Sequence, residues 1–169
     1  MRVKNDFYKM RAPEMAKALL GKLLCRRVDG KVIKLRITET EAYFGEDDTA
    51  CHASRGKTER TKTMYQEGGV AYIYLCYGIH NMLNIVSGEK DFPEACLIRG
   101  VEGYDGPGKL TKAMKIDRSL NGADMRTSEE LWLEDDGCSP VFEAGKRIGI
   151  GYASQEDQNR LWRFTLIYL

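Results

Sequence analysis

VIKLRITETEAY, residues 32 to 43, alternates apolar and polar side chains along its first half. This period of two predicts a β-strand whose apolar residues, between 33 and 37, face a hydrophobic core. Followed further, the same face next presents Glu39 and Glu41, so both acids are expected on the core side at the strand end. An unpaired buried carboxylate costs free energy. Either the strand has reached solvent by residue 39, or the acids bind water, a cation or a metal, or serve catalysis.

The segments on either side of this strand predict an α+β fold. Helices and consecutive strands are mixed without a regular βαβ alternation, which favours a mostly antiparallel sheet. The predicted fold is one domain over residues 1–169, with a curved sheet, flanking helices and a protruding β-hairpin. The predicted elements are a helix from Pro13 to about Leu24, a hairpin of strands 70–78 and 82–88, a strand at 95–99, a helix within 106–116, and strands at 146–153 and 161–169.

Composition is typical of a single globular domain. The chain has 169 residues, of which 43% are hydrophobic and 30% are charged. Its net charge of +1 hides a basic segment at 55–62 and acidic segments at 45–48 and 133–137, so the net charge does not identify a partner. No apolar run is long enough for a membrane span and no secretory leader is recognisable, so we expect an intracellular protein.

Metal and disulfide chemistry have little support in the sequence. The chain has five cysteines, never in CxxC spacing, and only two histidines, without an HxH or HExxH pattern. Reduced, mostly buried thiols and no metal site are therefore expected. A metal-dependent hydrolase using Glu39, Glu41 and His52 is the weaker alternative.

Tyrosines around the predicted hairpin have two interpretations. Tyr72 and Tyr74 share one strand face, and Tyr77 lies beside the turn at 78–81. An aromatic residue at a hairpin tip either covers the end of the sheet or enters a nucleic-acid stack as a wedge. A basic loop that could contact phosphates favours the interpretation of Tyr77 as a wedge, although basic loops are more often simply solvated. The basic residues of this loop are Arg55, Lys57, Arg60 and Lys62.

Four strings of residues, taken together and in order, closely resemble the alkyladenine (3-methyladenine, methylpurine) DNA glycosylase family. The resemblance covers about residues 7 to 165. It implies an enzyme without a metal or organic cofactor. Such an enzyme would act as a monomer on double-stranded DNA, flip a damaged purine into a pocket and hydrolyse the N-glycosidic bond. The strings are ITETEAYFGEDDTACHASRG, VAYIYLCYGIHNMLNIV, ACLIRGVE and GPGKLTKAMKI.

The resemblance also implies roles for individual residues. Glu41 matches the general base that activates water, and Arg99 matches an arginine close to it. Tyr77 matches the residue that fills the gap left by the flipped nucleotide, with Ile79 beside it against the neighbouring base pairs. The base pocket would be formed by Tyr43, His52, Tyr74 and Asn84. Contacts to the DNA backbone are expected from Arg55, Lys57, Arg60 and Lys109.

Two departures from the family pattern leave a second function open. His80 occupies a tip position where the family commonly has an aromatic residue, and the chain ends at LWRFTLIYL, short of a polar segment usual in the family. The alternative is a DNA-lesion binding module with marginal or lost catalytic activity. No lysine lies in the motifs around Glu41, so AP-lyase activity is not expected. The sequence does not rank 3-methyladenine, 7-methylguanine, hypoxanthine and ethenoadenine as substrates.

Overall fold

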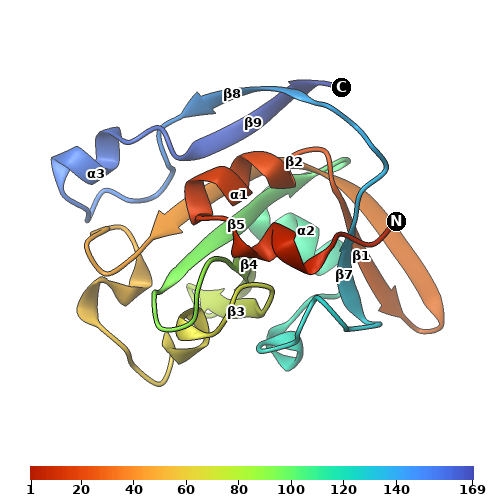
Figure 1. Cartoon of the computed structure of the whole chain (residues 1–169), viewed down its shortest axis with the longest axis horizontal. Helices are drawn as coiled ribbons and strands as arrows, with labels where there is room; N and C mark the ends of the chain where they lie inside the picture. Colours follow the sequence, from red (N-terminus) through yellow and green to blue (C-terminus); the bar gives the residue numbers. More distant parts are fainter.

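The computed structural model describes residues 1–169, and nine strands form one antiparallel sheet (Figure 1). The strands are β1 (Leu23–Val28), β2 (Lys31–Phe44), β3 (Ala71–Cys76), β4 (His80–Val86), β5 (Glu94–Val101), β6 (Tyr104–Asp105), β7 (Leu131–Glu134), β8 (Val141–Gly145) and β9 (Arg163–Tyr168). The helices are α1 (Ala12–Leu19), α2 (Pro107–Ala113) and α3 (Gln155–Asn159), with 3-10 turns η1 (Asn5–Lys9), η2 (His52–Arg55), η3 (Lys62–Tyr65) and η4 (Arg118–Leu120). This arrangement confirms the predicted α+β class with an antiparallel sheet.

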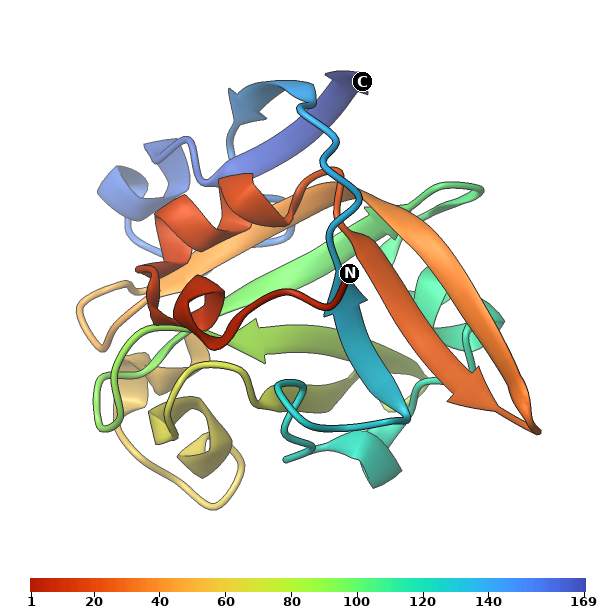
Figure 2. The same ribbon diagram turned by 45° about the vertical axis from the view of Figure 1, so that its right-hand side comes forward.

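Strand β2 is the centre of the sheet. Its first half pairs with β1, and its second half pairs with β5 on one side and β9 on the other. The strand order is β3-β4-β5-β2-β1-β7, with β8 paired to β9. Figure 2 shows the long β1–β2 hairpin extending from one end of the molecule and the β8–β9 hairpin above α1. The second half of β2 is therefore enclosed by strands on both edges.

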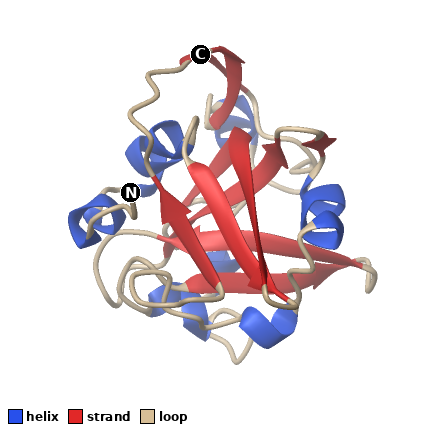
Figure 3. Ribbon diagram, turned by 90° about the vertical axis from the view of Figure 1, so that its right-hand side faces the viewer, coloured by secondary structure: helices blue, strands red, loops and turns tan.

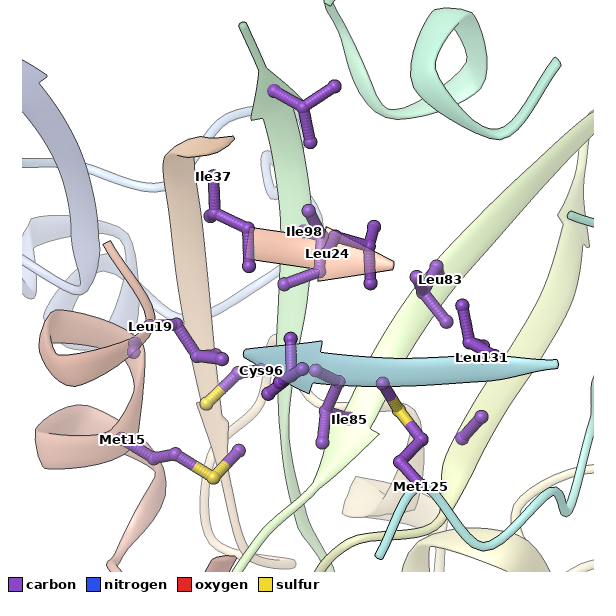
Figure 4. Packing of buried hydrophobic residues seen from close by; sticks show 14 of the residues in the cluster. Met15, Leu19, Leu24, Ile37, Leu83, Ile85, Cys96, Ile98, Met125 and Leu131 are labelled. Atoms are coloured by element: carbon purple, nitrogen blue, oxygen red, sulfur yellow. The ribbon is translucent and has the colours of Figure 1, made fainter. Parts of the chain in front are cut away.

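One face of the sheet carries the main core. A cluster of 25 buried residues joins α1, the region of α2 and the strands. Met15 and Leu19 lie four residues apart on α1, so they project from the same side of the helix onto the strands. Figure 4 shows them beside Ile85, Cys96 and other side chains of the strands. In Figure 3 the helices lie around the rim of the twisted sheet. The opposite face of strands β2 to β5 is therefore not part of the main core.

A β-bulge in β2 changes which residues face the core. Ile37 pairs with Val101, but the register shifts on both sides of Glu39. Ile37 and Ala42 both belong to the main core, although their positions differ in parity. The prediction that Glu41 lies on the same face as Ile37 was therefore wrong, because the bulge inserts an extra residue and reverses the alternation. Glu41 is buried, but on the opposite face of the sheet.

Two predicted elements need correction. The helix predicted to continue to Leu24 ends at Leu19, because Gly21 has φ +82°, and Leu23–Val28 instead pairs with β2 and β7. The strand predicted at 146–153 is a loop, in which Gly149 adopts φ +75°. Strands β1, β6, β7 and β8 and helix α3 were not predicted. No helix combines the length and apolar character needed to cross a membrane.

Candidate active site

Neighbouring strands bring the candidate residues together by register. Glu41 on β2 lies opposite Leu97 on β5, and Leu97 lies opposite Asn84 on β4. Asn84 in turn lies opposite Tyr72 on β3. These side chains alternate with core residues along each strand, so they form a row across the face opposite the main core.

A cavity of about 590 Å³ opens above this row. Its size lies in the range that small-molecule sites use. All four predicted base-pocket residues line it, together with the predicted Arg99 and the tip residue Tyr77. The lining also includes Tyr72, Tyr152 and Ile148, which the sequence did not identify. The cavity residues shared with the prediction are Tyr43, His52, Arg60, Tyr74, Tyr77, Asn84 and Arg99.

Glu41 is a fully buried carboxylate with three donors around it. The Tyr43 hydroxyl donates to Oε1 at 2.7 Å, and the backbone N–H of Ile148 donates to Oε2 at 2.7 Å. Nη1 of Arg99 lies 3.7 Å from Oε1. Burial raises the pKa of Glu41, and Arg99 and the two hydrogen bonds oppose that rise. The arrangement keeps a buried carboxylate fixed in orientation and close to a cation.

Glu39 lies on the same strand but has a different set of contacts. Its Oε1 accepts from Nε of Arg99 at 3.4 Å, and its Oε2 accepts from Nη1 of Arg163 at 3.0 Å. Arg99 is therefore held between Glu39 and Glu41. This geometry suits Glu39 to orienting Arg99.

His52 forms one wall of the cavity with the tyrosines of β3. Its Nδ1 lies 3.2 Å from the Tyr72 hydroxyl, and its ring meets the Tyr74 ring edge-on with centroids 4.5 Å apart. Burial, and secondarily the charge of Arg60, lower the pKa of His52 to about 4. The ring is therefore neutral near pH 7 and presents an aromatic surface rather than a charge.

This low pKa predicts a pH-dependent loss of stability. The unfolded chain binds a proton at His52 near pH 6.5, whereas the folded protein resists protonation until about pH 4. The contribution of His52 to stability is therefore full above pH 6.5 and is lost progressively as the pH falls toward 4. Between pH 7 and pH 5 the wild type should lose about 1–2 kcal/mol more unfolding free energy than His52→Gln. Urea unfolding at the two pH values measures this difference.

The exposed His80 provides the matched control. His80→Gln should retain the pH dependence of the wild type. Equal slopes for His52→Gln and the wild type would show that burial of His52 does not govern its protonation.

The β3–β4 hairpin ends in an exposed aromatic residue. Cys76 pairs with His80, so three residues make the connection. Tyr77 is 90% exposed and Ile79 is 71% exposed. Tyr77 has φ +54° and Gly78 has φ +68°, and the left-handed region is costly for a bulky residue. The tip thus holds a large apolar side chain in a strained and solvent-exposed position, next to the cavity.

The basic residues predicted to contact DNA have different surroundings. Arg60 lies over the Tyr74 ring at 5.1 Å and lines the cavity, so its side chain is turned toward the pocket. Arg55, Lys57 and Lys109 are exposed, and Nζ of Lys57 lies 5.5 Å from the Tyr65 ring. Contacts of these residues with phosphates stay predictions.

Several residues of the site were missed because they lie in the segment mistaken for a strand. Ile148 supplies the N–H bound to Glu41, and Tyr152 donates its hydroxyl to the carbonyl of Ala50 at 2.7 Å. Tyr72 could have been included, since it shares a strand face with Tyr74. No signal in the sequence links the 146–153 segment to Glu41.

No group of three or more His, Cys, Asp or Glu side chains lies close enough together to hold a metal ion. The three residues of the metal-hydrolase hypothesis contact other partners. Glu39 pairs with Arg99 and Arg163, Glu41 accepts from Tyr43 and Ile148, and His52 contacts Tyr72.

Known proteins resemble this chain over most of its length. The family model of methylpurine-DNA glycosylase matches residues 6–105 and 102–167. A protein of Psychrobacter cryohalolentis is 45% identical over 89% of this chain and 85% of its own length. A protein of Borreliella afzelii is 46% identical over 95% of this chain and 93% of its own length. A protein of Natranaerobius thermophilus is 40% identical over 98% of this chain and 96% of its own length. All three are provisionally named 3-methyladenine DNA glycosylase. The chain belongs to the methylpurine-DNA glycosylase family.

Proposed function

We propose that this protein is a monofunctional glycosylase that flips an alkylated or deaminated purine out of duplex DNA and hydrolyses its N-glycosidic bond. The observation that carries the proposal is the buried Glu41 carboxylate beside an aromatic cavity of about 590 Å³, held by Arg99, Tyr43 and the Ile148 N–H. Membership of the family supports the reaction class. We propose further that the protein acts inside the cell as a monomer.

In the proposed reaction Glu41 is the general base. Its carboxylate orients a water molecule and takes a proton from it as the water oxygen attacks the anomeric carbon. The bond from that carbon to the purine nitrogen breaks, and its electron pair leaves with the base. The negative charge of Glu41 also stabilises the positive charge that develops on the sugar. Arg99 favours the ionised form of Glu41, because its charge opposes the rise in pKa that burial causes.

The leaving base sets the remaining demand for a proton. A cationic base such as 3-methyladenine departs as a neutral molecule and needs no acid. Neutral hypoxanthine or ethenoadenine departs more easily when it is protonated. No lysine lines the cavity, which supports water rather than an amine as the nucleophile.

The cavity walls are suited to a flat, unpaired base. Tyr43 is proposed to stack on one face of the flipped purine, with His52 and Tyr74 on the other side. Burial keeps His52 uncharged, so the ring can accept or donate one hydrogen bond at the edge of the base. Tyr77 is proposed to enter the minor groove and occupy the space of the flipped nucleotide, with Ile79 against the adjacent base pair.

Asn84 is proposed to exclude normal guanine. Its side chain is buried, and Nδ2 donates to the carbonyl oxygens of Tyr72 at 3.3 Å and Met82 at 3.4 Å, which fixes the amide in the cavity wall. A fixed amide near the purine 2-position would clash with the exocyclic amine of guanine. Asn84→Ser should therefore raise excision of guanine relative to hypoxanthine by about 10-fold, a change of roughly 1.4 kcal/mol. Competition between the two duplexes in one reaction measures the ratio, and an unchanged ratio would remove this role.

The proposed function is tested by single-turnover release of base from the wild type in the presence of EDTA. The substrates are duplexes with one hypoxanthine or one ethenoadenine, and DNA treated with a methylating agent. We expect release of free base and an abasic site that remains uncleaved until alkali is added. Tight binding to the lesion duplexes without release from any substrate would instead identify a lesion-binding protein. Release that EDTA abolishes would return attention to a metal-dependent reaction.

A further inference from the structure

Arg147 is an arginine of the C-terminal loop that is buried completely. Its side chain is 0% exposed and that of its partner Asp48 is 1% exposed. Nη1 donates to Oδ2 of Asp48 at 2.6 Å, and Nη2 donates to Oδ1 at 3.0 Å. A guanidinium matches a carboxylate in this two-bond geometry, and removal of one partner of a buried pair is strongly destabilising. The pair therefore joins the loop after β2 to the loop between β8 and α3 in one fixed arrangement.

The same guanidinium makes further contacts on all sides. Nη1 also donates to the carbonyl of Ala42 at 3.0 Å, and Nη2 to the carbonyl of Asp157 at 3.2 Å. The rings of Tyr43 and Trp162 lie 5.1 Å and 5.0 Å from its central carbon. Only Nε has no partner. Arg147 thus links β2, the loop after β2, its own loop and α3.

These contacts surround Glu41 without touching it. Ala42 and Tyr43 follow Glu41 directly, and Ile148 follows Arg147 directly. The Tyr43 hydroxyl and the Ile148 N–H are the two groups that donate hydrogen bonds to the carboxylate. The arginine therefore holds the ring of one donor and the backbone of the other.

We propose that Arg147 is a positioning residue for the reaction, which fixes the Ile148 N–H and the Tyr43 hydroxyl on Glu41 and so sets the orientation of the carboxylate toward water. This inference rests on the proposed function, and it adds a role for a residue outside the cavity lining. The forked guanidinium is needed because two carboxylate oxygens and two carbonyl oxygens are bound at once. A lysine has one nitrogen and cannot replace these contacts.

The charged and titratable groups that face Glu41 are few. They are Arg99 from β5, Tyr43 from β2, Tyr152 from the loop before α3, and Arg147 itself at a greater distance. Since the hydrogen bonds of Ile148 and Tyr43 lower the pKa of Glu41, their displacement should raise it. As the pH is lowered, Glu41 would then become protonated, and activity would be lost, at a higher pH than in the wild type. Damage to the fold elsewhere would lower the amount of active protein but would not move this pH limb.

The test compares Arg147→Lys with Arg160→Lys. Arg160 also lies over Trp162, at 4.9 Å, and pairs with Asp157, but its side chain is 40% exposed and it contacts none of the groups that hold Glu41. We expect Arg147→Lys to lower the single-turnover rate about 10- to 100-fold at pH 7, because small displacements of a catalytic group have effects of this size. The acid limb of the pH–rate profile of Arg147→Lys should shift to higher pH, and this variant should still bind the lesion duplex. Arg160→Lys should match the wild type in all three measurements.

A second readout does not depend on activity. Carbon NMR of labelled glutamate side chains follows the titration of Glu41, identified by its absence in Glu41→Gln. Its midpoint should rise in Arg147→Lys and should be unchanged in Arg160→Lys. If Arg147→Lys does not fold, Asp48→Asn should give the same direction of change, since it retains the arginine and removes only the charge of its partner.

The outcomes separate the two proposals. Base release by the wild type but not by Glu41→Gln supports the proposed function, whatever Arg147→Lys does. An unaltered NMR midpoint and pH profile in folded Arg147→Lys would overturn the positioning role. If the wild type releases no base, the proposed function fails, and the NMR midpoint still decides whether Arg147 controls Glu41.

Discussion

Glu41→Gln should lower single-turnover base release by about 10²- to 10⁴-fold, the range over which a general base contributes. The amide cannot take a proton from water, and it carries no charge to stabilise the developing cation on the sugar. The surroundings make the effect severe. Tyr43, Ile148 and Arg99 all present donors to the carboxylate, so the NH₂ group of glutamine must face a donor. The measurement is release of hypoxanthine or ethenoadenine from a duplex with enzyme in excess.

Binding distinguishes a chemical role from a structural one. Glu41→Gln should bind the lesion duplex about as tightly as the wild type, because the row of pocket side chains remains in place. Glu39→Gln is the control on the same strand, and it should lose less activity because Glu39 contacts Arg99 and Arg163 rather than the proposed water. If Glu41→Gln lost binding as well as release, Glu41 would be a structural residue of the pocket.

Tyr77→Ala should weaken binding to a lesion duplex by about 1–3 kcal/mol, which is the usual contribution of an aromatic ring stacked on a base. The ring is 90% exposed in the free protein, so its loss removes little packing. The left-handed backbone at Tyr77 is held without help from the side chain, and alanine can adopt it at a similar cost. Titration by fluorescence anisotropy in a Glu41→Gln background measures affinity without turnover.

Tyr168→Ala is the matched control for this substitution. Tyr168 is 60% exposed on β9 and does not line the cavity. Its replacement should leave affinity for the lesion duplex unchanged. Equal affinity of Tyr77→Ala and the parent protein would show that the hairpin tip does not enter the DNA.

Local sequence patterns predicted the strands whose residues alternate or favour β-structure. The alternation in residues 32–43 corresponds to β2, and the β-forming residues at 70–78 correspond to β3. Residues 146–153 also alternate, as KRIGIGYA, but two of the alternate positions are glycine, and Gly149 takes a positive φ. There the N–H of Ile148 binds a side chain rather than a neighbouring strand, so long-range contacts outweigh the local pattern.

In the candidate site too, residues within sequence motifs were predicted, and contacts between distant segments were not. Glu41, Arg99, Tyr43 and Tyr74 were identified because their motifs resemble those of a family. The structure places the last three around one cavity, and Tyr43 and Arg99 connect it to the buried Glu41. The Asp48–Arg147 pair joins residues 99 positions apart, and neither residue stands out in its own segment. Arg60 was predicted to face a phosphate, and its position over Tyr74 depends on how the loop at 56–61 folds back.

The bulge in β2 has a consequence for how this protein can vary. Strand β2 presents core residues on one face and Glu41 on the other, and the register shift near Glu39 changes which positions face the core, Ile37 before it and Ala42 after it. Loss of one residue there would turn Glu41 into the core and bring Ala42 into the pocket. Exchange of a side chain in the first half of β2 affects only local packing. Insertions and deletions in this strand should therefore be far less acceptable in related proteins than substitutions.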